Sequence, residues 1–218
     1  MVVMRAALFD LDGTLINTER RSLAMWAMLL DNHGVEHDPA LLRRFMGRRG
    51  ADVLPEFFPD GDVRALLDEV HSYHDRPGLP DIVPVPGAAE LVRRVAAHGS
   101  AIGLVTSAGR AWARERLTQV GVADLVQTIV SAEDVVVGKP DPAGFLEAAA
   151  RLDVKPDECV VFEDSLAGIA AAEAARMACV GVATTHRPDE LGHADLVISD
   201  LSGIDWPLTG IRWSRPRY

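Results

Sequence analysis

The stretch AALFDLDGTLIN, residues 6–17, puts two carboxylates, Asp10 and Asp12, directly after an apolar run. The apolar residues are typical of a buried strand, and Asp12-Gly13 is a dipeptide that commonly turns the chain where a strand stops. A turn accounts for Asp12 but leaves Asp10 without a role. Because no basic residue stands beside the two acids, their charge has to be balanced from elsewhere in the chain.

Short β-rich runs recur along the rest of the chain and alternate with helical patterns. Strands that are apolar throughout and separated by helices are typical of a parallel sheet covered on both faces. The sequence therefore predicts an α/β fold built on a doubly wound parallel sheet. The expected strands lie at 3–9, 101–106, 126–131, 159–162, 178–183 and 195–199, and the expected helices at 87–99, 110–121, 141–154 and 165–177.

The exception to this alternation is the long interval between the first two strands. Residues 18–80 are mainly helical in pattern, which makes them too long for one crossover and too helical for a loop. We expect a small helical domain inserted after the first strand, with the proline-rich segment 76–87 as its return linker. The predicted division is a core of residues 1–16 and 82–218 and an inserted domain of residues 17–81.

Composition narrows the class of protein. The chain has 218 residues, of which 48% are hydrophobic and 25% charged, as in ordinary globular proteins. A formal net charge of -10 argues against binding nucleic acid through a broad basic face. Cys159 and Cys179 lie in apolar runs, so we expect reduced core residues. No apolar run reaches membrane-spanning length, and we expect a cytoplasmic monomer with no membrane partner.

Polar residues gather at the predicted strand ends. In open parallel sheets, ligands bind beyond the carboxyl ends of the strands, so we expect the functional residues there. We expect four carboxylates, two hydroxyls and one lysine to meet at this rim: Asp10, Asp12, Glu163, Asp164, Thr106, Ser107 and, from the loop VVVGKPDP, Lys139.

The same residues fall in four ordered motifs: DLDGT (10–14), TS (106–107), GKP (138–140) and FEDSLAGIAAA (162–172). In this order they resemble the haloacid dehalogenase superfamily, and the helical insertion falls where that family carries its type-one cap. The resemblance implies a Rossmann-like core with a helical cap. The last motif looks most like the branch that holds β-phosphoglucomutase and small sugar-phosphate phosphatases.

The chemistry of the residues agrees with phosphoryl transfer. Attack by Asp10 on phosphorus would give an aspartyl phosphate and divide one difficult displacement into two. Asp12, two residues along the strand and so on the same side, can protonate the leaving oxygen and later deprotonate water. Asp10, Glu163, Asp164 and a phosphate dianion outweigh the one charge of Lys139, so a cation is needed, and oxygen ligands favour Mg²⁺.

Individual roles follow from the resemblance. It implies that Asp10, the backbone carbonyl of Asp12 and Asp164 coordinate Mg²⁺. Glu163 is either a further ligand or a neighbour that contacts the ligands. It also implies that Thr106, beside Ser107, and Lys139 bind the phosphoryl oxygens. Arg48 and Arg49 stand in GRRGADVL, which resembles the cap loop that faces the substrate, and Arg49 is the candidate for substrate binding.

Each residue also has a purely structural explanation. Asp10 could be a buried turn acid, Thr106-Ser107 a helix N-cap, Lys139 a solvated loop residue, and Glu163-Asp164 a complement to a helix dipole. Taken together, these explanations require several independent coincidences.

The sequence leaves three functions to weigh. The first is a Mg²⁺-dependent phosphatase that acts on a small phosphorylated metabolite, expected to be a sugar phosphate. Asp12 supports it, because the metal-free dehalogenases of the family that the chain resembles use the same nucleophile but lack an acid two residues later. The second is a β-phosphoglucomutase, disfavoured because Ser22 stands where the mutases typically carry a histidine; Asn17 also replaces an acid usual in the branch. The third is a non-catalytic phosphate-binding protein, which would be expected to have lost one of the motif residues. The sequence does not indicate the substrate. It also indicates no function for the tail 205–218, for which packing on the core and disorder both stay open.

Overall fold

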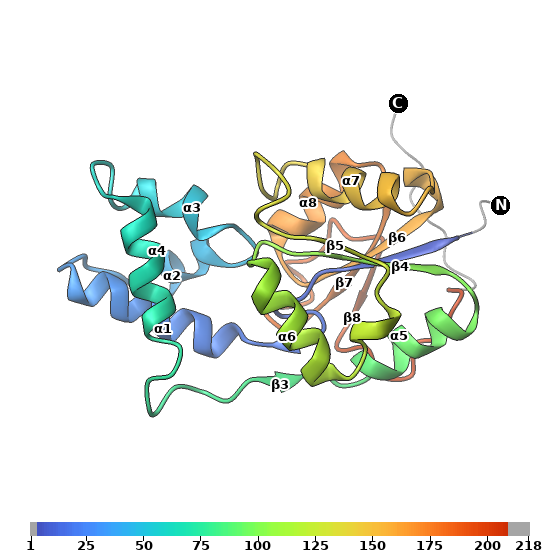
Figure 1. The fold of residues 1–218 in the computed structure, drawn as a ribbon, viewed down its shortest axis with the longest axis horizontal. Coiled ribbons are helices and arrows are strands. Elements are labelled where there is room, and N and C mark those ends of the chain that lie inside the picture. Colours follow the sequence, from blue (N-terminus) through green and yellow to red (C-terminus); the bar gives the residue numbers. More distant parts are fainter. Residues whose placement is uncertain (1–3, 209–218) are drawn as a thin grey trace.

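The computed structural model describes residues 4–208 (Figure 1). Its centre is a six-stranded parallel sheet in the order β5-β4-β1-β6-β7-β8, which confirms the predicted doubly wound α/β fold. The strands are β1 (Ala6–Phe9), β4 (Ala101–Val105), β5 (Thr128–Val130), β6 (Cys159–Glu163), β7 (Ala178–Val182) and β8 (Leu196–Ile198).

Helices cover both faces of this sheet. In Figure 1, α7 (Ala143–Arg151) and α8 (Leu166–Ala174) lie above it, and α5 (Ala88–Ala97) and α6 (Arg110–Val120) lie below. Alternate residues of β1 serve the two layers, since side chains along a strand point to opposite faces. Ala6 and Leu8 pack with the α7 and α8 side, whereas Ala7 and Phe9 pack with the α5 and α6 side. A strand buried on both faces has to be apolar throughout, as AALF is.

The order of the strands positions the ligand site. β1 lies between β4 and β6, so the chain leaves it toward one half of the sheet and later returns to the other half. Such a reversal opens a crevice at the carboxyl ends of the central strands. β1 runs toward the helical lobe, and its carboxyl end therefore faces that lobe (Figure 1).

The segment between β1 and β4 forms that helical lobe. It contains α1 (Glu19–Asn32), α2 (Pro39–Leu42), α3 (Gly50–Val53) and α4 (Val63–Ser72). These helices have an apolar cluster of their own, which includes Leu29, Phe45, Leu54 and Val70. We refer to this lobe as the cap. Its division from the core at residues 17 and 81 stays our proposal.

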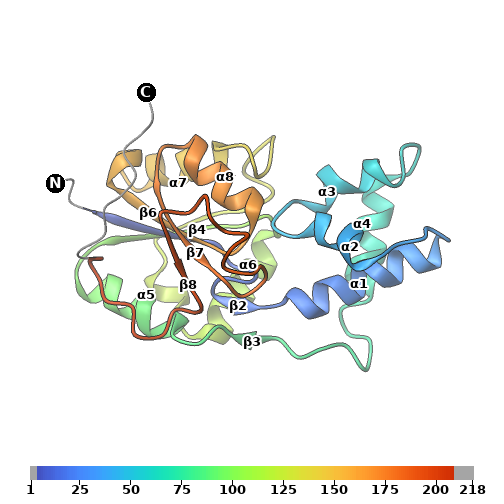
Figure 2. The same ribbon diagram turned by 180° about the vertical axis from the view of Figure 1, so that it is seen from behind.

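Two short strands join the cap to the core. β2 (Ile16–Asn17) pairs antiparallel with β3 (Val83–Pro84), which brings the outgoing and returning connections together (Figure 2). Short 3-10 turns complete the described chain at Arg43–Phe45, Leu54–Glu56, Ala123–Leu125 and Pro156–Glu158.

Side-chain caps explain where several helices begin. Asp38 accepts a hydrogen bond from the Leu41 amide at 2.7 Å at the start of α2, and Pro39 occupies the first helical position. Asp62 caps α4 in the same way, accepting from the Arg64 and Ala65 amides. These local signals start the short cap helices, which then depend on the apolar cluster for stability.

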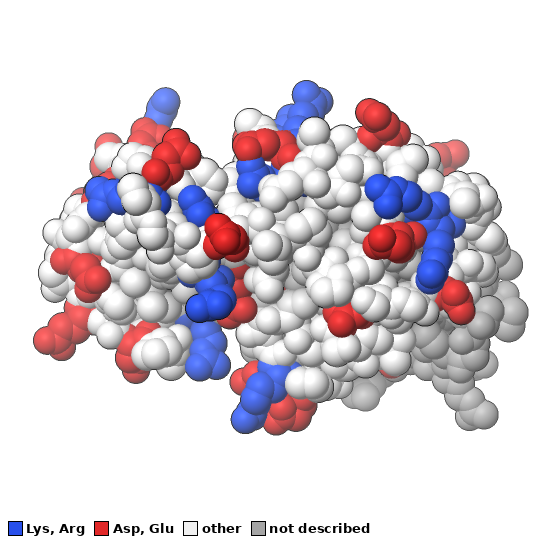
Figure 3. All heavy atoms as spheres, turned by 90° about the horizontal axis from the view of Figure 1, so that it is seen from below, with Lys and Arg blue, Asp and Glu red and all other residues white. Residues whose placement is uncertain are grey.

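The remaining sequence features are accounted for in part. Cys159 and Cys179 are buried free thiols, as predicted. Trp206 of the tail donates to Ser100 Oγ at 2.9 Å and packs against the core, whereas residues 209–218 lie outside the described residues. Within residues 4–208, no helix is long and apolar enough to cross a membrane. On the face drawn in Figure 3, basic and acidic side chains are interspersed.

Candidate active site

Four charged residues from distant parts of the chain meet at the carboxyl ends of the central strands. Asp10 follows β1, Glu163 ends β6, Asp164 follows it, and Lys139 comes from the loop between β5 and α7. All four side chains are buried, with no residue more than 6% exposed. Charged groups are seldom buried unless they are paired or bind an ion, so this cluster is a candidate functional site.

Lys139 lies at the centre of the cluster. Its Nζ donates to Asp10 Oδ1 at 2.5 Å, to Glu163 Oε1 at 2.6 Å and to the Val105 carbonyl oxygen at 3.0 Å. These three bonds use the three donors of an ammonium group. Burial lowers the pKa of Lys139, but the carboxylates of Asp10 and Glu163 outweigh this effect and raise the pKa above its ordinary value. The side chain is therefore a fixed positive charge.

Three carboxylates still face this one ammonium. One oxygen each from Asp10, Glu163 and Asp164 lie within 4.8 Å of one another. Burial first, and then the charge of Glu163, raises the pKa of Asp164 to about 8. Burial likewise raises the pKa of Asp10 well above its ordinary value, against the opposing effect of Lys139. The excess negative charge and the hard oxygen donors fit a divalent cation such as Mg²⁺.

Hydroxyl groups hold Asp164 in place. Thr14 Oγ1 donates to Asp164 Oδ1 at 2.8 Å, and Thr185 Oγ1 donates to Asp164 Oδ2 at 2.6 Å. Gly13 has a φ of +92°, and a Cβ there would lie 2.1 Å from Asp164 Oδ2. Only glycine allows the turn after β1 to pass this close to the carboxylate.

Glu163 is fixed by the start of α8. Its Oε2 accepts from the Ser165 amide at 2.8 Å and from Ser165 Oγ at 2.9 Å. Ser165 Oγ also accepts from the Gly168 amide at 3.0 Å, which makes Ser165 the N-cap of α8. A Cβ at Gly168 would lie 1.7 Å from Glu163 Oε1, so FEDSLAG needs glycine at its last position.

Asp12 belongs to a separate hydrogen-bonded group. Its Oδ1 accepts from Thr18 Oγ1 at 2.8 Å and from Trp112 Nε1 at 3.1 Å. Burial raises the pKa of the Asp12 carboxyl, and the bonds from Thr18 and Trp112 act in the opposite direction. The side chain is not part of the acidic cluster, and the ligand atom predicted for this residue is its backbone carbonyl oxygen.

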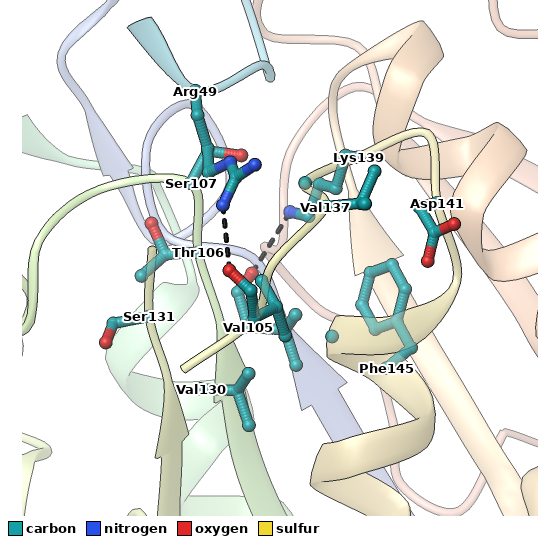
Figure 4. Close-up of a pocket in the computed structure, with 13 residues that line it drawn as sticks. Arg49, Val105, Thr106, Ser107, Val130, Ser131, Val137, Lys139, Asp141 and Phe145 are labelled. Atoms are coloured by element: carbon teal, nitrogen blue, oxygen red, sulfur yellow. Dashed lines mark hydrogen bonds between the residues drawn. The ribbon is translucent and has the colours of Figure 1, made fainter. Parts of the chain in front are cut away.

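The four residues predicted to bind phosphate or substrate line one small cavity at the border of cap and core: Arg49, Thr106, Ser107 and Lys139 (Figure 4). Its volume is about 10 Å³. A cavity of that size holds about one water molecule and no phosphate group. The cavity in this conformation is therefore too small to hold a phosphate group.

Polar contacts from the cap loop close this cavity. Ser107 Oγ donates to the Gly47 carbonyl oxygen at 2.9 Å. Arg49 pairs with Asp52 at 2.7 Å and donates to the carbonyl oxygens of Val135 at 2.9 Å and Val136 at 2.7 Å. Arg49 thus bridges the cap and the core loop that carries Lys139.

Four neighbours of the predicted residues were not singled out from the sequence: Thr14, Thr18, Trp112 and Thr185. Thr14 stands inside DLDGT and could have been included with that motif. Trp112 and Thr185 lie 100 and 21 residues away from the acids that they bind, and nothing in the sequence pattern links them.

A doubly wound α/β core with a helical cap, carrying a buried lysine and acidic cluster at its topological switch point, defines a class of enzyme suited to phosphate esters. The chain belongs to the haloacid dehalogenase-like hydrolase family, whose model matches residues 7–182.

Individual relatives agree with this assignment. The chain is 41% identical to a validoxylamine A 7'-phosphate phosphatase of Streptomyces hygroscopicus subsp. limoneus, over 94% of this chain and 98% of that protein. It is 28% identical to a β-phosphoglucomutase of Bacillus subtilis, over 98% and 97% of the two chains. A solved hydrolase from Pseudomonas syringae has the same fold, with a TM-score of 0.82, 27% identity, and coverage of 90% of this chain and 94% of that one. The chain is a phosphoric monoester hydrolase.

Proposed function

We propose that the chain is a Mg²⁺-dependent phosphatase that hydrolyses a small phosphorylated metabolite, of the sugar-phosphate class, through an aspartyl phosphate on Asp10. The observation that carries this proposal is the pairing of Asp10 with Lys139 at 2.5 Å, beside the acids Glu163 and Asp164. A nucleophilic carboxylate needs its charge offset before a phosphate dianion can approach, and this pairing offsets part of it.

Asp10 starts the reaction. One of its carboxylate oxygens forms a bond to phosphorus while the bond from phosphorus to the ester oxygen breaks. Two negative unit charges about 4 Å apart, such as those of the Asp10 carboxylate and a phosphoryl oxygen, repel by about 4 kcal/mol at an effective dielectric constant of 20. The positive charge of Lys139 offsets part of this repulsion and so lowers the barrier. Mg²⁺, held by Asp10, Asp164 and the Asp12 carbonyl with Glu163 beside them, would supply the further positive charge that the phosphoryl oxygens require.

Asp12 donates a proton in the first step and accepts one in the second. When the ester bond breaks, the electron pair remains on the leaving oxygen, which takes a proton from the Asp12 carboxyl. In the second step the Asp12 carboxylate accepts a proton from the water that attacks phosphorus, and Asp10 is released. Thr106 and Ser107 line the side of the site where phosphoryl oxygens would bind, and Arg49 would close it from the cap.

A second cavity supports a small substrate. It has a volume of about 260 Å³ and lies between α1, α2 and the loop that holds Thr185, which binds Asp164. The polar side chains Glu19 and Arg43 and the apolar Leu23 and Leu42 line it. Most ligand pockets for larger molecules exceed about 300 Å³. The non-phosphoryl part of a sugar-sized metabolite would suit this space. One relative named a phosphorylated carbohydrates phosphatase and another named a hexitol phosphatase favour that class.

A β-phosphoglucomutase activity is the second candidate, favoured by the full-length similarity to such an enzyme. Such a mutase returns the phosphoryl group to a sugar hydroxyl rather than to water. Ser22, in the first turns of α1, occupies the position where mutases typically have a histidine, and this disfavours the mutase. Our expectations of a cytoplasmic monomer that binds no nucleic acid stay predictions.

A substrate panel tests the proposal. Purified protein is incubated with sugar phosphates and other phosphorylated metabolites, with Mg²⁺ or with a chelator, and both phosphate release and ester isomers are measured. We expect Mg²⁺-dependent phosphate release that Asp10→Asn abolishes. Isomerisation of β-glucose 1-phosphate faster than phosphate release would establish the mutase instead, and release that survives chelation would contradict the role of Mg²⁺.

A further inference from the structure

Trp112 makes a contact that the roles given to the site residues so far do not explain. It lies in the first turn of α6, on the core, and its indole Nε1–H donates to Asp12 Oδ1 at 3.1 Å. The same oxygen accepts from Thr18 Oγ1 at 2.8 Å. Both of these donors therefore bind one oxygen of the carboxyl, and Oδ2 is the oxygen left to carry a proton toward a substrate.

The orientation of the indole is fixed from two sides. The guanidinium carbon of Arg116, one turn further along α6, lies 4.3 Å from the centre of the Trp112 ring. The His74 ring, which follows α4 of the cap, packs edge-on at 4.5 Å. Arg116 is itself buried, at 7% exposure. A ring held in this way aims its N–H in one direction.

Packing alone does not account for this arrangement. A phenylalanine ring could also pack between Arg116 and His74, but it has no hydrogen-bond donor, whereas an indole carries an N–H at its edge. That donor meets the acid which, in the proposed function, transfers the proton. An acid displaced by about 1 Å can lose about 10²-fold in rate, so a second donor that fixes the carboxyl has a direct effect on turnover.

We propose that Trp112 is a positioning residue for Asp12, which holds Oδ2 of the carboxyl toward the leaving oxygen of the substrate. This inference rests on the proposed phosphatase function. As Asp10 bonds to phosphorus and the ester bond breaks, the electron pair stays on the leaving oxygen, and that oxygen takes the proton from Asp12 Oδ2. Trp112 acts through Asp12 and does not touch the reacting atoms.

The dependence of rate on the leaving group tests the proposal. 4-Nitrophenyl phosphate and phenyl phosphate have similar shapes, but the phenol leaves less readily and needs the proton more. Trp112→Phe removes the donor and keeps an aromatic ring. We expect Trp112→Phe to lower kcat for phenyl phosphate about tenfold, which is less than the roughly 10²- to 10⁴-fold effect of a complete general acid. For 4-nitrophenyl phosphate we expect kcat to change less than about twofold.

Trp206→Phe is the matched control. It removes another indole donor, the one that binds Ser100 Oγ at 2.9 Å, and we expect the ratio of the two kcat values to stay at the wild-type value. Replacement of Trp112 by 3-benzothienylalanine removes only the N–H from a ring of the same shape. This variant reproduces the Trp112→Phe result if positioning is the cause, and it remains informative if Trp112→Phe does not fold.

The results that would contradict the positioning role differ from those that would contradict the proposed function. A benzothienylalanine variant that keeps the wild-type ratio, or one that loses equally with both esters, would overturn the positioning role while leaving the phosphatase assignment intact. Wild-type protein that released no phosphate from either ester would overturn the proposed function, and the role of Trp112 with it.

Discussion

Lys139 Nζ lies between two carboxylates, 2.5 Å from Asp10 Oδ1 and 2.6 Å from Glu163 Oε1. The contact joins three segments that are far apart in the sequence: the end of β1, the end of β6 and the loop before α7. It also gives the cluster of Asp10, Lys139, Glu163 and Asp164 its one positive side chain. The charge of Lys139 should therefore matter for turnover.

Lys139→Met keeps most of the side-chain volume and removes the charge. We expect kcat for 4-nitrophenyl phosphate to fall about 10²–10³-fold, because a preorganised charge that stabilises the transition state is lost. Lys155→Met changes the chain's only other lysine, which is exposed, and should leave kcat unchanged. Near-normal turnover by the Lys139 variant would contradict this account of the site.

Gly168→Ala tests whether the position of Glu163 matters for cation binding. The new Cβ would lie 1.7 Å from Glu163 Oε1, so the carboxylate has to move. Because residues that orient metal ligands typically contribute about 10–100-fold to affinity, we expect the Mg²⁺ concentration for half-maximal activity to rise by at least about tenfold. Gly192→Ala, where the nearest atom is 3.7 Å away, is the control. An unchanged Mg²⁺ requirement would exclude Glu163 from the cation site.

The raised pKa of Asp164 predicts a pH-dependent stability. Its ordinary value is 3.8 and the folded value about 8, so between these pH values the folded state binds more protons than the unfolded state. The free energy of unfolding of the metal-free protein should therefore fall as pH rises through this window, by at most about 1.4 kcal/mol per pH unit for one proton.

Mg²⁺ should reverse this loss, since it compensates the charge of the ionised acids. We expect the gain in Tm on replacing a chelator with Mg²⁺ to be larger at pH 8 than at pH 5.5, in thermal unfolding followed by circular dichroism. Asp164→Asn removes the titrating group and should reduce the difference between the two pH values. An equal gain at both pH values in the wild-type protein would show that the acidic cluster does not bind the cation.

Arg49 and Arg48 form a matched pair in the cap loop. Arg49 binds carbonyl oxygens of the core loop, whereas Arg48 pairs with Glu56 of the cap at 2.9 Å. We expect Arg49→Ala to raise KM for the sugar-phosphate substrate about tenfold and to change KM for 4-nitrophenyl phosphate little, because the smaller ester makes few cap contacts. Arg48→Ala should change neither value. Equal increases for both substrates with Arg49→Ala would remove Arg49 from the specificity site.

The fold could be predicted largely because its signals are local. AALF and CVVF are apolar without interruption, and a strand with that pattern has to be covered on both faces, so the parallel sheet followed. The acids at the strand ends could be predicted for the same reason, since the carboxyl ends of parallel strands meet at one edge.

The residues that support those acids could not be predicted. Trp112 stands in a helix whose pattern indicates only that it packs on the sheet, and its bond to Asp12 depends on how α6 docks. Thr185 reaches Asp164 from the loop after β7. The partners of Arg49 depend on the docking of the cap onto the core, which sequence periodicity does not specify.

The central claim is that Asp10 becomes phosphorylated. Rapid acid quenching during the first turnover, followed by borohydride reduction, converts an aspartyl phosphate into homoserine, which mass spectrometry locates in the peptide. We predict homoserine at position 10, dependent on substrate and Mg²⁺, and absent from Asp10→Asn. Phosphate bound at another residue, or an Asp10→Asn protein with wild-type turnover, would contradict the claim.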